Sequence, residues 1–103
     1  MMTYSYAHAR EIFGKASRRL RSHIGTPQER LWYAGKELAV LRDSELPSEM
    51  LSDFKALYDA FNTEKARGDE GTIAATIAKL SPQEAKALKK RVIDMATKIR
   101  GEY

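Results

Sequence analysis

The segment TPQERLWYAGKELAVLR, residues 26 to 42, contains both a start signal for a helix and the apolar pattern of a helix that other helices surround. Thr26 can accept a hydrogen bond from the amide of Glu29, and Glu29 can reach back to the amide of Thr26, which makes a capping box with proline in the first turn. Apolar residues then occur on most sides, so we expect a central helix over about residues 27 to 42. Its main stripe consists of Leu31, Ala34, Leu38 and Leu41.

Gly35 lies inside this apolar stripe. Glycine weakens a helix relative to alanine, so its presence here favours a neighbouring segment that approaches the backbone closely. The sequence therefore predicts a tight contact at Gly35.

Four further helices are predicted around this one. An apolar repeat at steps of three and four residues, from Tyr6 to Ile24, predicts a helix over about residues 4 to 23. Amphipathic patterns predict helices over about residues 47 to 62 and 72 to 79, and a second capping box, SPQE, begins a helix that ends near residue 99. The segment TEKARGDEG, residues 63 to 71, has two glycines and five charged residues and is predicted to be a mobile polar loop.

These patterns indicate the fold class. No stretch alternates with a period of two residues, so we expect an all-α bundle of about five helices, four long and one short, without a sheet. With 103 residues, the chain has room for one core and therefore for one domain.

The composition argues against most catalytic chemistries. The chain has no cysteine, which excludes disulfides and thiolate chemistry. His8 and His23 are too far apart to ligate one metal ion from adjacent turns, and we expect His23 to border the core instead. No phosphate-binding loop or nucleophile motif surrounds the hydroxyl residues. We therefore expect no enzymatic activity, metal or cofactor.

The sequence also indicates a location. The N-terminal residues lack the apolar run of a signal peptide, and the longest apolar runs, such as TIAATIA, are too short to cross a bilayer. We expect a soluble cytoplasmic protein without membrane insertion.

The net charge of +4 is distributed unevenly along the chain. Residues 1 to 42 carry eight Lys/Arg against three Asp/Glu, residues 43 to 71 carry three against eight, and residues 72 to 103 carry seven against three. Opposite blocks can attract one another within the fold, so we expect acidic residues such as Glu49 and Asp53 to form a solvated face that balances the basic helices.

Two predicted helices have basic faces. In KASRRLRSHIG, residues 15 to 25, the cations spread over the whole outer half of the helix, which is typical of a solvent-exposed face. In the last helix the cations occupy a narrower arc that includes the apolar Ile93. The candidate anion-binding or nucleic-acid-binding residues are Arg18, Arg19, Arg21, Gln83, Lys86, Lys89, Lys90 and Arg100.

Two functions fit this sequence. The first is a non-catalytic interaction or regulatory module that binds a protein partner or a second copy of itself, with contacts from residues that lie off the main core stripes. These contacts are Trp32, Tyr33, Val40 and Ile93. The alternative is a DNA-binding regulator, because residues 72 to 100 resemble a helix-turn-helix whose last helix enters the major groove, although Lys79 occupies the position where such motifs usually have glycine.

Overall fold

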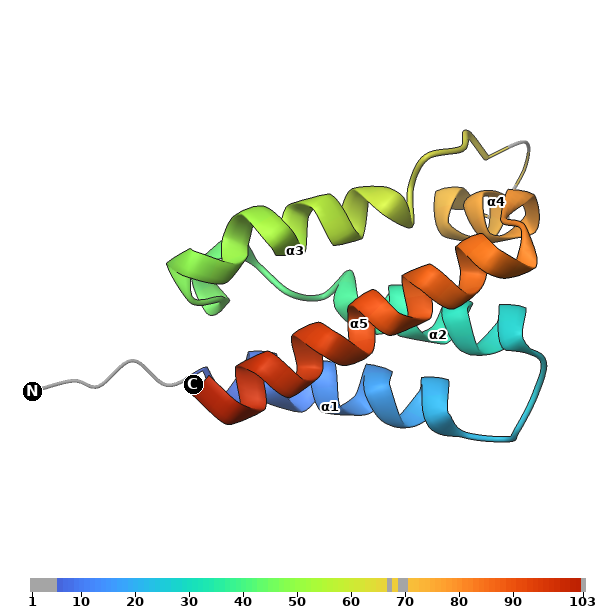
Figure 1. The fold of residues 1–103 in the computed structure, drawn as a ribbon. Helices are drawn as coiled ribbons and strands as arrows, with labels where there is room; N and C mark the ends of the chain where they lie inside the picture. Colours follow the sequence, from blue (N-terminus) through green and yellow to red (C-terminus); the bar gives the residue numbers. More distant parts are fainter. Residues whose placement is uncertain (1–5, 67, 69–70, 103) are drawn as a thin grey trace, which may run out of the picture.

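The computed structural model describes residues 6–66, 68 and 71–102, and these residues form an all-helical bundle without strands (Figure 1). The predicted fold class is confirmed, with four long helices and one short helix. The helices are α1 (Ala7–Arg21), α2 (Pro27–Leu38), α3 (Ser48–Ala60), α4 (Gly71–Lys79) and α5 (Pro82–Glu102), with a short 3-10 helix η1 (Asp43–Glu45) before α3. Three residues of the predicted mobile loop, 67, 69 and 70, lie outside the described residues, as do residues 1 to 5.

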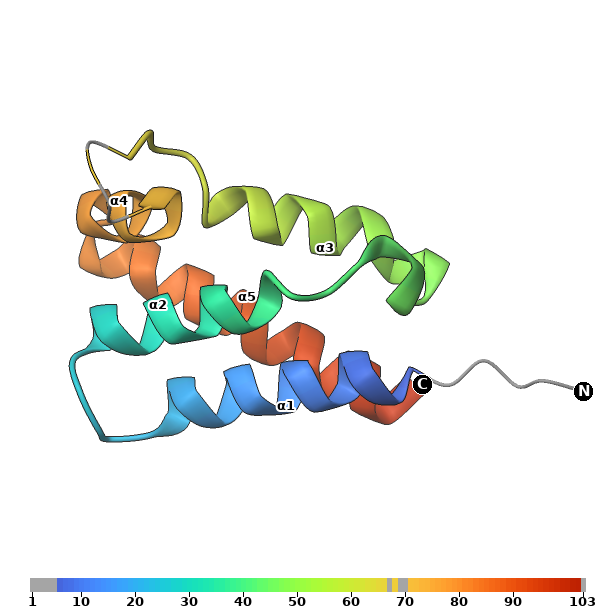
Figure 2. The same ribbon diagram turned by 180° about the vertical axis from the view of Figure 1, so that it is seen from behind.

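Helix α1 packs against both α2 and α5, while α2 also contacts α4 and α5, as expected of a central helix. Helices α1 and α5 run antiparallel, and α3 lies on the opposite side of the molecule from α1 (Figures 1 and 2). Helix α1 is therefore packed against α5 on the side of the molecule away from α3.

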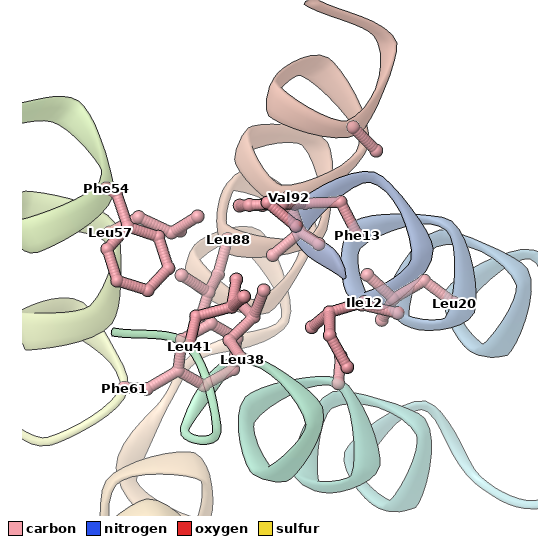
Figure 3. Packing of buried hydrophobic residues seen from close by; sticks show 14 of the residues in the cluster. Ile12, Phe13, Leu20, Leu38, Leu41, Phe54, Leu57, Phe61, Leu88 and Val92 are labelled. Atoms are coloured by element: carbon pink, nitrogen blue, oxygen red, sulfur yellow. The ribbon is translucent and has the colours of Figure 1, made fainter. Parts of the chain in front are cut away.

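The core is a single cluster to which all five helices contribute. Figure 3 shows side chains of α1, α2, α3 and α5 meeting in it. The rings of Phe13 and Phe54 join α1 to α3 edge to face, with centroids 6.0 Å apart, a favourable geometry for aromatic pairs. The apolar periodicity therefore identified the inner faces of the helices.

The close approach predicted at Gly35 is confirmed. A β-carbon at this position would lie 2.9 Å from Phe61 Cδ1 and 3.0 Å from Ile73 Cγ2. Both distances are shorter than a van der Waals contact, so only glycine allows the end of α3 and the start of α4 to lie this close to α2.

Both predicted capping boxes are present. The amide of Glu29 donates to Thr26 Oγ1 over 3.1 Å, and the amide of Thr26 donates to the Glu29 carboxylate over 3.3 Å. The second box repeats this exchange between Ser81 and Glu84, at 3.1 Å and 2.8 Å. These bonds satisfy amides that have no partner inside the helix, and so they define where α2 and α5 begin.

The predicted end of α2 near Arg42 is wrong, because the helix ends at Leu38. The amides of Val40 and Leu41 bond to carbonyls three residues back, at 3.3 Å and 3.2 Å, so the chain tightens into a turn. Leu41 still enters the core with 9% of its surface exposed, whereas Val40 is 55% exposed.

Two predictions at the end of α1 are also wrong. The helix ends at Arg21, and Ser22 has extended backbone angles, which turn the chain out of the helix. Ile24 is therefore 84% exposed rather than part of the apolar stripe, and His23 is exposed rather than bordering the core. At the other end of the chain, α5 continues to Glu102, past the predicted end near residue 99.

In the described part of the chain, no helix combines the length and apolar content that crossing a bilayer requires.

Candidate anion-binding seam between α1 and α5

The cations of α1 do not form one patch. Lys15 and Arg19 lie toward α2, Arg21 lies toward α5, and Arg18 borders the hollows on both sides. The hollow toward α2, of about 620 Å³, is also lined by Glu29 and Glu37 together with further cations, so its charges are mixed.

The hollow toward α5, of about 440 Å³, has a more uniform charge. We call it the arginine groove, and it is lined by Arg10, Arg18, Arg21 and Arg100. Its lining also includes four small residues, namely Gly14, Ser17, Ala96 and Thr97. The only carboxylate among its lining residues is Glu11, which pairs with Lys15 at 3.6 Å.

Three arginines of this groove have no carboxylate partner in the part of the chain that the structure describes. Among the described residues, no Asp or Glu oxygen lies within 4.0 Å of the guanidinium of Arg18, Arg21 or Arg100. Helix α3, whose sequence contains Glu49, Asp53 and Asp59, lies on the opposite side of the molecule from α1 (Figure 1). A guanidinium without a partner is well suited to an anion from outside, because its planar fork matches carboxylates and phosphates.

A second hollow of about 440 Å³ lies where the ends of α1 and α4 meet the starts of α2 and α5. We call it the apolar hollow, and its apolar lining includes Leu20, Leu31, Ile77, Leu80 and Ala85. Its rim consists of Gln28, Arg30, Gln83, Lys86 and Lys89, and no carboxylate lines it.

One flank of α5 connects the two hollows. Lys89, Ile93 and Arg100 recur near multiples of one helical turn and share this flank. Ile93 is half-buried and packs against the core between Lys89 in the apolar hollow and Arg100 in the arginine groove. We call the two hollows with Ile93 between them the α1–α5 seam. From Lys86 to Arg100 it follows α5 for about 21 Å.

The structure divides the predicted anion-binding residues among four places. Arg18, Arg21 and Arg100 line the arginine groove, while Gln83, Lys86 and Lys89 line the apolar hollow. The remaining two are engaged elsewhere, because the guanidinium of Arg19 lies 4.4 Å from the ring centroid of Tyr33 and Lys90 pairs with Asp94 at 2.6 Å.

The sequence reasoning missed Arg10 and Arg30 as lining residues. Arg10 precedes Arg21 by about three helical turns, so helical spacing alone places both on the same side of α1. No helical spacing in the sequence indicated a position for Arg30 beside these residues. Its Nη1 donates to the carbonyl of Gly25 over 2.7 Å, a contact that depends on how the chain turns between α1 and α2.

The four predicted protein-contact residues line no common hollow. Trp32 is half-buried, and its ring meets that of Tyr33 edge to face, with centroids 4.9 Å apart. Val40 borders a separate hollow of about 430 Å³ beside His8, whereas Ile93 belongs to the α1–α5 seam. Of the four, only Ile93 lies in the seam.

His8 has a structural contact of its own. Its Nδ1 pairs with the carboxylate of Glu45, which ties the start of α1 to η1. This hydrogen bond, together with one from the amide of Arg42, lowers the pKa of Glu45 below its ordinary value. Within the described residues, no three His, Asp or Glu side chains gather to hold a metal ion.

Comparisons of this chain with protein-family models, with curated proteins and with solved structures found no match.

Proposed function

We propose that the protein is a non-catalytic helical interaction module that binds an acidic segment of a partner protein along the α1–α5 seam. The observation that carries this proposal is the arginine groove, in which Arg18, Arg21 and Arg100 have no carboxylate within 4.0 Å among the described residues. Each guanidinium can hold a carboxylate through two parallel hydrogen bonds.

A peptide fits the seam better than a phosphate backbone does. The seam combines cations with the apolar side chains of Ile93, Leu80 and Ala85. A polypeptide supplies both carboxylates and apolar side chains, whereas the phosphate backbone of a nucleic acid offers no apolar group there.

DNA binding is the second candidate, because α4 and α5 are joined only by Leu80 and Ser81 and because Gln83, Lys86 and Lys90 are exposed on α5. Two features weigh against it. Lys89 is half-buried along the apolar hollow, and Lys90 pairs with Asp94.

Fluorescence anisotropy tests the proposal. The probe is a labelled 12-residue peptide rich in Asp and Glu, titrated with the wild-type protein and with the triple variant Arg18→Gln, Arg21→Gln, Arg100→Gln. The control triple variant Lys65→Gln, Lys79→Gln, Lys98→Gln removes the same charge from exposed positions outside the seam. We expect the groove variant to lose at least about tenfold in affinity and the control less than about threefold.

Two results would overturn the proposal: no binding of the peptide at low salt, or equal losses in both triple variants. A labelled random DNA duplex serves as the second arm. If the duplex binds more tightly than the peptide, and if Lys86→Gln and Lys90→Gln weaken it more than the arginine substitutions do, DNA binding replaces the proposal.

A further inference from the structure

The geometry points to an amphipathic partner: the apolar hollow takes a large apolar side chain of the bound segment, and carboxylates flank that side chain. This inference rests on the proposed function, since it assigns to one segment both the carboxylates for the arginine groove and the apolar anchor for the hollow.

The hollow has a firm apolar floor. Leu20 and Leu31 are each 2% exposed and Ile77 is 6% exposed, so the floor belongs to the packed core. Leu80 and Ala85 are only half-buried and pack against that core. An apolar side chain that entered the hollow would remove their remaining surface from water. The volume of about 440 Å³ lies in the range of roughly 300–1,000 Å³ that is usual for pockets that enclose small ligands.

The rim selects an acidic segment. Arg30 is held in place by carbonyls at the turn after α1, with its Nη1 2.7 Å from the oxygen of Gly25 and 3.4 Å from that of Ile24. Lys86 and Lys89 contribute two more cations from α5, and none of the lining residues is acidic. When an apolar side chain occupies the hollow, the residues before and after it in the bound segment lie near these cations. Asp or Glu at those positions therefore meets complementary charge.

A second folded copy of this chain does not supply such a segment from its acidic region. In the acidic stretch from Asp43 to Asp59, four large apolar residues are at most 5% exposed, namely Leu46, Met50, Phe54 and Leu57. The two others, Leu51 and Tyr58, are half-buried and pack against the core of their own molecule. The occupant is thus a segment of a different protein, with an exposed apolar residue among carboxylates.

Two labelled 12-residue peptides test this inference. They share the same Asp and Glu residues and differ only at two central positions, which are Leu in one and Ser in the other. We expect the wild-type protein to bind the Leu peptide about tenfold more tightly than the Ser peptide. We also expect the double variant Lys86→Gln, Lys89→Gln to lose at least about threefold more affinity for the Leu peptide than the control double variant Lys65→Gln, Lys98→Gln. Because the comparison varies the peptide, it does not depend on the folding of a core variant.

The failures of the two proposals are distinguishable. If both peptides bind equally and both depend on the groove arginines, the inference is wrong and the proposed function stands. If neither peptide binds, the proposed function itself fails. Amide shifts in ¹H–¹⁵N spectra give a second readout: the Leu peptide should move Leu80 and Ala85, and shifts confined to Ile24 and Tyr33, which lie outside this hollow, would overturn the inference.

Discussion

The ring of Phe61 lies directly against the backbone of Gly35, so that a β-carbon on Gly35 would come within 2.9 Å of Phe61 Cδ1. Ile73 of α4 lies against the same spot, at 3.0 Å. One glycine in α2 therefore determines how closely the end of α3 and the start of α4 can pack on the central helix.

Gly35→Ala should destabilise the protein by about 1–3 kcal/mol, because the added methyl group must displace an aromatic ring and a branched side chain in a packed core. Alanine's better helix propensity, worth about 1 kcal/mol, offsets only part of this. Gly14→Ala is the matched control: the nearest atom to its β-carbon is the flexible end of Arg18, at 3.3 Å. Chemical denaturation should show opposite signs for the two variants, and a Gly35→Ala protein as stable as the wild type would contradict the assigned contact.

Thr76 joins α4 to the segment that follows α3. Its hydroxyl is fully buried, donates to the carbonyl of Thr72 over 2.7 Å and accepts from the amide of Glu64 over 3.0 Å. Thr76→Val keeps the shape of the side chain but leaves the amide of Glu64 without this acceptor, which should cost about 1–3 kcal/mol. Hydrogen exchange at Glu64 should accelerate in the variant.

The control for Thr76 is Thr97→Val. Thr97 also donates to a carbonyl, that of Ile93 over 3.0 Å, but it is exposed. Water can replace that bond, so the cost should stay within about 0.5 kcal/mol. Equal losses of stability in the two valine variants would show that burial of the Thr76 hydroxyl is not the reason for the cost of Thr76→Val.

The capping box of α5 should make stability depend on pH. The amide and hydroxyl of Ser81 lower the pKa of Glu84 below its ordinary value of 4.5. The folded protein therefore binds a proton here less readily than the unfolded chain, so this contribution is complete above the unfolded pKa and is lost as the pH falls through the lower folded value. Thermal unfolding measured between about pH 6 and pH 3 should show a smaller acid-induced loss in Glu84→Gln than in the wild type.

Ser81→Ala provides the check on cause. The backbone amide of Ser81 is the larger cause of the lowered pKa of Glu84 and its hydroxyl the smaller one, so Ser81→Ala, which keeps the amide, should flatten the acid dependence only in part. A Ser81→Ala protein with the full wild-type slope would mean that the hydroxyl contributes nothing, and one with the slope of Glu84→Gln would mean that the amide contributes nothing.

The contrast between Leu20 and Ile24 tests where α1 ends. Leu20→Ala should cost about 2–5 kcal/mol, because it opens a cavity in the core. Ile24→Ala should change stability by less than about 0.5 kcal/mol, because Ile24 is 84% exposed. Denaturant midpoints of the two variants measure this difference. A large loss of stability in Ile24→Ala would mean that Ile24 is buried in the core.

Ile24 and Leu41 also show how far the sequence alone could lead. The apolar spacing predicted all five helices and most of their inner faces, and capping signals located the starts of α2 and α5. Spacing cannot say where a helix stops, however. The stripe of α1 continues in phase to Ile24, although the chain leaves the helix at Ser22, and Leu41 reaches the core from beyond the end of α2.

The candidate seam was only partly predictable. Helical wheels identified Arg18, Arg21 and Arg100 as exposed cations, but their gathering in one groove depends on the antiparallel packing of α1 on α5, which local patterns do not encode. Arg30 enters the apolar hollow through a turn between helices. Only the three-dimensional structure therefore distinguishes the cations that line a common groove from cations such as Lys90, which forms an ion pair with a residue of its own helix.

Helices α1 and α3 lie on opposite sides of the bundle, and because the sequence of α1 is net positive and that of α3 is net negative, we expect an electric dipole moment across the molecule. The field of such a dipole extends about 8 Å at physiological ionic strength, roughly one Debye length. An anionic partner that approaches within this distance would rotate the protein so that α1 leads, and encounters would then occur in the productive orientation more often than chance allows. Salt should therefore slow association more than it hastens dissociation.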